Sequence, residues 1–132
     1  MKARSVGAVL AGFVTVAVLS IGTDALLHAT SVFPPMGVRM SDPLFVLAAV
    51  YRAAYTAVGG WVTARLAPTA PMNHAWVLAA LGTLSGLAGI IVNLNGGDAM
   101  GPMWYAASIP LSAFPCIGLG AWLYSRRVPL AR

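Results

Sequence analysis

The chain carries little charge and almost no cysteine. Only 8% of its 132 residues are charged, whereas a soluble domain usually has about 25%. With so few charges, the chain cannot coat a water-facing surface, so we exclude a soluble globular domain. Cys116 is the only cysteine, which excludes an intrachain disulfide, a C-x-x-C pair and a thiolate metal cluster.

Recognisable catalytic and nucleotide-binding motifs are also missing. The sequence has no H-E-x-x-H, G-x-S-x-G, Walker or G-x-G-x-x-G pattern, and no spacing typical of a metal site. The net charge of +5 does not indicate nucleic acid, because the basic residues fall mostly at the ends of apolar runs rather than in a stripe with aromatics. We therefore expect no metal, no cofactor and no nucleic-acid partner.

Long apolar runs dominate the chain, which is 59% hydrophobic. Four of them, at about 6–28, 44–66, 74–94 and 103–124, reach the roughly 20 residues that a helix needs to cross a bilayer. Asp42-Pro43, Asn73 and Pro102 stand where helix starts are expected. The sequence thus predicts an all-α integral membrane protein, with one domain over 1–132 and four transmembrane helices in an antiparallel bundle.

The first run has a competing interpretation as a signal peptide, since Lys2 and Arg4 precede it. It is long for the apolar core of a signal peptide, and it lacks a favoured Ala-x-Ala cleavage site, so we favour a retained helix.

Positive charge predicts the orientation. One face of the predicted bundle has six basic residues, and the other has only Arg39, opposed by Asp42 and Asp98. Because basic residues accumulate on the cytoplasmic side, we expect a bacterial-type inner membrane with both termini cytoplasmic. The six are Lys2, Arg4, Arg65, Arg126, Arg127 and Arg132.

Two charges lie inside the predicted spans, Asp24 in the first and Arg52 in the second. A charge inside a membrane is costly unless it is paired or reaches water, so it marks a functional or architectural site. At 1.5 Å per residue, Asp24 lies about 6 Å and Arg52 about 12 Å below the outer ends of their spans. The long arginine stem can cover that difference, so we predict that they pair.

Small residues recur every fourth position, which places them on one face of each helix. Close backbone contact between such faces drives helix association in membranes. Asp24 and Arg52 belong to these faces, so both should turn inward. In the first predicted helix this face comprises residues 8, 12, 16, 20, 24 and 28, and in the second it comprises residues 48, 52, 56, 60 and 64. In the third it comprises residues 82 and 86, with residues 85, 89 and 93 alongside, and in the fourth residues 108, 112, 116 and 120.

Further polar groups are expected in the same outer half of the bundle. Tyr51 is adjacent to Arg52, and for both Tyr51 and Tyr55 the alternative to a site role is packing with their hydroxyls hydrogen-bonded. The ligand-binding or ion-pair candidates are Asp24, Arg52, His28, Tyr55, Asn93 and Tyr105. We assign none of them a catalytic role.

Three functions remain open. The favoured one is a non-enzymatic four-helix protein whose polar cluster serves packing or partner binding. The first alternative is a small oligomeric transporter or channel that uses the cluster as its binding site, since the chain is similar in size and span count to the small multidrug resistance transporters. The second alternative is an enzyme acting on a lipid or quinone. Whichever function applies, the expected partners of the chain are the lipid bilayer and, through the small-residue faces, further copies of the chain.

Overall fold

The computed structural model describes residues 2–97 and 100–127. This part is all-helical, with α1 at Lys2–Ala29, α2 at Asp42–Leu66, α3 at Pro71–Gly96 and α4 at Met103–Arg127. All four helices are long and apolar enough to cross a membrane. The predicted all-α class with four candidate spans is therefore confirmed, and each helix extends beyond its predicted run. Asp98 and Arg132, which entered the predicted charge asymmetry, lie outside the described residues.

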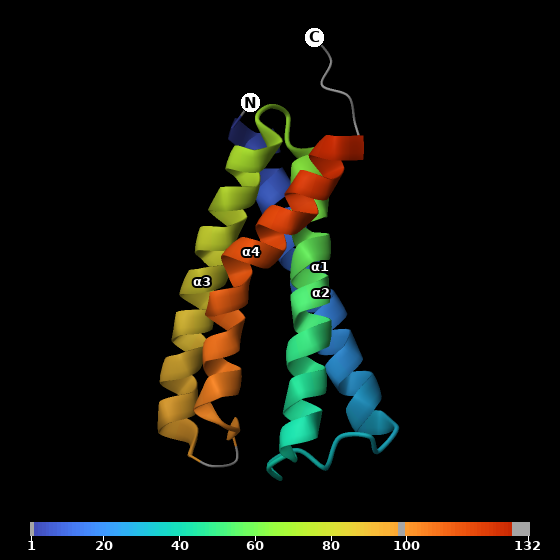
Figure 1. Ribbon diagram of the computed structural model, residues 1–132, viewed down its shortest axis with the longest axis vertical. Coiled ribbons are helices and arrows are strands. Elements are labelled where there is room, and N and C mark those ends of the chain that lie inside the picture. Colours follow the sequence, from blue (N-terminus) through green and yellow to red (C-terminus); the bar gives the residue numbers. More distant parts are fainter. Residues whose placement is uncertain (1, 98–99, 128–132) are drawn as a thin grey trace.

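The helices follow one another up and down the long axis of the molecule (Figure 1). The start of α1, the end of α4 and the connection between α2 and α3 lie together at one end. We call this the basic end, because Lys2, Arg4, Arg65, Arg126 and Arg127 lie in the first or last turns there. The half of the molecule away from it, which contains the connection between α1 and α2, is called the distal half.

Prolines fix the starts of α2 and α4 close to the predicted positions. Asp42 is the first residue of α2, with Pro43 second and Ser41 as the N-cap, so the predicted cap is displaced by one residue. Pro102 immediately precedes α4 rather than opening it. Shifts of one residue do not change the interpretation of these helix starts. Proline lacks an N–H, and at the first positions of a helix the backbone N–H has no partner within the helix.

The prediction for the start of α3 is wrong. Pro71 is the first helical residue, and Ala70 is the N-cap in a left-handed conformation with φ 41°. Asn73 therefore lies within the first turn instead of capping it. With proline at the first helical position, the connection ends three residues earlier than a cap at Asn73 would place its end.

The core lies toward the basic end and is made largely of alanine. With such small side chains, the helix backbones approach closely, which is the main source of helix association in an apolar environment. The core cluster consists of Val9, Ala64, Ala75, Leu78, Ala79, Ala113, Ile117 and Ala121.

Glycine brings α1 against α2. A Cβ added at Gly12 would lie 2.7 Å from the carbonyl oxygen of Gly59 and would overlap the Thr63 hydroxyl. Thr63 is fully buried and donates a 3.1 Å hydrogen bond to the Ala8 carbonyl of α1. The two backbones therefore cross at a point where no larger side chain fits.

Glycine also brings α4 against α2 and α3. A Cβ at Gly60 would lie 2.8 Å from the Ile117 Cα, and one at Gly120 would lie 2.9 Å from the Trp61 nitrogen. On α3, a Cβ at Gly86 would lie 2.8 Å from the Pro110 ring. Gly12, Gly60, Gly86 and Gly120, one small-residue position on each helix, thus serve contacts within the chain, whereas Ser85 and Gly89 of α3 are exposed.

The predicted inward face of α4 is only partly right. Ser108, Ser112 and Cys116 are half-buried, whereas the buried positions are Ala106, Pro110, Ala113, Ile117, Gly118, Gly120 and Ala121. The helix contains two prolines and changes direction about halfway along (Figure 1). Proline removes a backbone hydrogen bond and bends a helix, so the inward face does not follow one straight four-residue spacing.

We expect Gly60→Ala to destabilise the protein by about 1–3 kcal/mol, because the added methyl group meets the Ile117 backbone, which cannot move like a flexible side chain. Gly22→Ala is the matched control, since a Cβ there meets nothing within 4 Å. Unfolding in detergent followed by circular dichroism measures both. Equal stability of the two variants would contradict the close crossing of α2 and α4.

Candidate functional site

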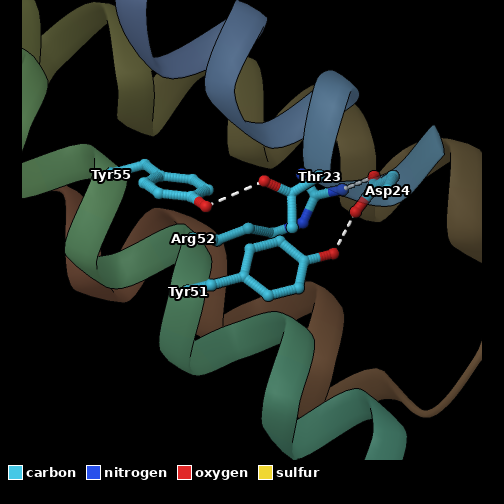
Figure 2. Close-up of polar contacts among 5 residues, drawn as sticks. All are labelled: Thr23, Asp24, Tyr51, Arg52 and Tyr55. Atoms are coloured by element: carbon cyan, nitrogen blue, oxygen red, sulfur yellow. Dashed lines mark hydrogen bonds and ion pairs between the residues drawn. The ribbon is translucent and has the colours of Figure 1, made fainter. Parts of the chain in front are cut away.

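Asp24 on α1 and Arg52 on α2 form an ion pair in the distal half (Figure 2). Arg52 Nη2 donates to Asp24 Oδ2, and the Tyr51 hydroxyl donates to Asp24 Oδ1. Both oxygens of the carboxylate are therefore bonded, and both donors come from α2. The arginine and aspartate side chains are 30% and 29% exposed, so the pair is largely covered.

The pair spans a difference in depth. At 1.5 Å per residue, Asp24 lies about 8 Å from the end of α1 and Arg52 about 15 Å from the start of α2. The arginine stem extends toward Asp24 (Figure 2) and so carries its charge out of the middle of the helix. This is the partner that the sequence favoured, at a slightly larger difference in depth.

A second contact joins the same two helices one turn further along α2. The hydroxyls of Thr23 and Tyr55 lie 2.8 Å apart, and the Tyr51 and Tyr55 rings are 5.7 Å apart at their centroids. Tyr51 and Tyr55 are four residues apart, and Thr23 precedes Asp24. Neither Tyr51 nor Thr23 was among the predicted site residues, although the spacing of the two tyrosines places both of their side chains on one side of α2.

His28 closes the connection that follows α1. Its Nδ1 lies 2.8 Å from the Pro34 carbonyl oxygen, and its ring packs edge-on against Phe33 at 5.4 Å. Phe33 is buried, so this connection folds back over the bundle. The histidine holds the connection in place, and it lies next to a cavity that the pair also borders.

This distal cavity has a volume of about 350 Å³. Four of the six candidate residues line it, namely Asp24, His28, Arg52 and Tyr105, together with apolar side chains that include Phe33 and Phe45. The Tyr105 ring packs 5.0 Å from the Phe45 ring. The structure therefore gathers polar groups from α1, α2 and α4 around one space.

Asn93 does not belong to this group. Its Nδ2 donates to the carbonyl oxygens of Met100 and Gly101, both at 3.3 Å, and the side chain is buried. It therefore supports the connection between α3 and α4, where backbone carbonyls would otherwise lack donors. Tyr55 does not line the cavity either, and its hydroxyl points toward Thr23 (Figure 2).

Arg52 retains one buried group without a partner. Within residues 2–97 and 100–127, its Nε is the only buried side-chain nitrogen or oxygen with no hydrogen bond. An unpaired donor in an apolar setting is costly. Of the guanidinium nitrogens, Nη2 thus bonds to Asp24, whereas Nε has no partner.

No protein-family model, curated protein or solved structure matches this chain. The described residues contain no group of three or more His, Cys, Asp or Glu side chains placed to hold a metal ion. The geometry defines an all-helical protein with four candidate membrane spans and a polar cluster between α1 and α2.

Tyr51→Phe should destabilise the protein more than Tyr55→Phe, although both remove one hydroxyl from neighbouring turns of α2. The Tyr51 hydroxyl bonds to a carboxylate, which is worth about 1.5–3 kcal/mol, whereas the Tyr55 hydroxyl makes a neutral bond worth about 0.5–1.5 kcal/mol. Unfolding in mixed micelles gives both values. A larger loss for Tyr55→Phe would show that Asp24 does not depend on Tyr51.

Proposed function

We propose that the chain is an integral protein of a bacterial-type inner membrane, with its helices in an antiparallel transmembrane bundle and both termini cytoplasmic. The distribution of charge supports this orientation. The described basic residues other than Arg39 and Arg52 cluster at the basic end. Arg65 lies over the Trp61 ring at 5.1 Å and Arg126 over the Trp122 ring at 4.5 Å, an arrangement suited to a headgroup interface.

Within this bundle, the polar cluster functions as an interhelical clamp between α1 and α2 in the outer leaflet. One observation carries this proposal: both oxygens of Asp24 accept hydrogen bonds from α2 alone. A carboxylate bonded in this way fixes the position of one helix against another. It also gives Arg52 the partner that a charge in a membrane requires.

The same contacts make catalysis the weakest of the three functions. A general base must be positioned to take a proton from a substrate, whereas both oxygens of Asp24 are engaged with side chains of α2. His28 Nδ1 lies against Pro34. A transporter would need assembly, because one four-helix chain has little room for a pathway from one side of the membrane to the other. Oligomer formation through the small-residue faces stays a prediction. The glycine contacts described above join helices of a single chain.

Paired apolar replacement tests the clamp. We expect Asp24→Leu or Arg52→Met alone to cost about 3–5 kcal/mol, because each leaves a charge without its partner. The double variant should recover most of this loss, since a buried pair can be replaced by apolar residues of similar volume. Unfolding in detergent measures the three variants against the unmodified protein.

Additive losses in the double variant would overturn the clamp, since two sites that do not interact lose stability independently. The clamp would also be overturned if Asp24→Leu and Arg52→Met were each as stable as the unmodified protein.

Orientation has its own test in two cysteine variants of a Cys116→Ala background. Met36→Cys lies in the connection between α1 and α2, where Met36 is highly exposed, and Thr69→Cys lies in the exposed connection between α2 and α3. In intact spheroplasts, a membrane-impermeant maleimide should label Met36→Cys and spare Thr69→Cys until the cells are opened. The reverse pattern would invert the proposed orientation.

A further inference from the structure

A second cavity lies deeper in the bundle, near the middle of the helices. We call it the central cavity. Its volume is about 340 Å³, within the ~300–1,000 Å³ range of small-molecule sites. All four helices contribute to its wall, and its apolar part includes Phe13, Val16, Leu78, Ile109 and Ile117. It is therefore a space between helices rather than a shallow groove on one of them.

The central cavity opens between α1 and α3. Ile21 on α1 and Ser85 and Gly89 on α3 line it and are exposed, although α3 was expected to turn its small residues inward. In a membrane this side meets lipid chains, so the natural entrants are lipid-soluble molecules. Water would have to cross the apolar region to reach it.

Polar groups nevertheless lie in its wall. Ser20 and Ser85 line the cavity, and within the described residues neither hydroxyl has a hydrogen bond to another group. Ser20 is only 4% exposed. Arg52 borders the cavity from α2 and carries the unpartnered Nε. Hydroxyl and guanidinium donors in an apolar space favour an occupant that brings an acceptor.

The charge around Arg52 selects the class of acceptor. Asp24 already balances the guanidinium charge and does not line the central cavity. A second anion would have to compete with Asp24, whereas a neutral oxygen acceptor can add to the remaining donors without disturbing the pair. A carbonyl oxygen has this property, because it accepts hydrogen bonds and carries no charge.

We propose that the central cavity binds a neutral, lipid-soluble carbonyl compound, with its apolar body among the four helices and its oxygen toward Ser20, Ser85 and Arg52. This binding role goes beyond the clamp. The choice of a neutral occupant rests on the Asp24–Arg52 ion pair, but it does not depend on how much that pair stabilises the bundle. The occupant enters from the bilayer through the opening between α1 and α3.

Gly89 offers a way to close this cavity without disturbing the helix contacts. A Cβ added there meets nothing within 4 Å, so Gly89→Leu adds its side chain to the lining of the central cavity. Gly22→Leu is the matched control, because a Cβ at Gly22 also meets nothing within 4 Å and Gly22 does not line the cavity. Both variants make the same change of glycine to leucine within a helix.

The probes are 2-tridecanone and tridecane, two chains of the same length of which only one has a carbonyl group. Each is equilibrated with the purified protein in micelles, and the amount retained above protein-free micelles is measured by gas chromatography. The unmodified protein and Gly22→Leu should bind the ketone about tenfold more tightly than the alkane. Gly89→Leu should weaken ketone binding by about tenfold, and Ser20→Ala with Ser85→Ala should reduce the preference for the ketone.

Equal retention of ketone and alkane by the unmodified protein would overturn the proposal, because the cavity would then accept any lipid chain. Loss of ketone binding in Gly22→Leu to the same extent as in Gly89→Leu would also overturn it. Melting temperatures of both glycine variants identify a variant that has unfolded. For such a variant, Gly89→Ala and Gly22→Ala replace the leucine pair, and the same outcomes decide. The clamp is judged separately, since its test measures stability without any ligand.

Discussion

Two adjacent glycines on α2 hold the bundle together, because they let one helix touch two neighbours at backbone distance. Gly59 faces α1 at Gly12, and Gly60 faces α4 at Ile117. Contacts this close fix where the helices cross. Toward the distal half the backbones of α2 and α4 diverge (Figure 1), but the Phe45 and Tyr105 rings still pack against each other there. The alanine-rich core near the basic end and the two cavities beyond it are both results of this crossing.

The ion pair belongs to the half where packing is looser. The side chains near the basic end are small enough for van der Waals contact to hold the helices. Further along, α1 and α2 are joined by the polar contacts of Thr23, Asp24, Tyr51, Arg52 and Tyr55. Arg52 also borders both the distal and the central cavity. The residue that completes the clamp thus lines both spaces.

The sequence predicted the helices well because long apolar runs leave few alternatives. It also gave Asp24 its partner, since depth along two neighbouring helices is set by a constant rise per residue. Features that depend on irregular backbone could not be predicted from the sequence. Asn93 bonds to carbonyls of a connection whose path no periodicity describes, and the inward face of α4 moves where proline bends the helix. Tyr51 was visible as a neighbour of Arg52, but its contact with Asp24 depends on how α1 and α2 cross.

The order of Asp24 and Arg52 along the chain has a consequence for biosynthesis. α1 is among the most apolar of the four helices and α2 is the least apolar, so α2 has the weakest tendency to enter a bilayer by itself. Synthesis proceeds from the N-terminus, so Asp24 leaves the ribosome before Arg52. In the proposed membrane topology, the least apolar helix would therefore insert after the helix that carries its counter-charge.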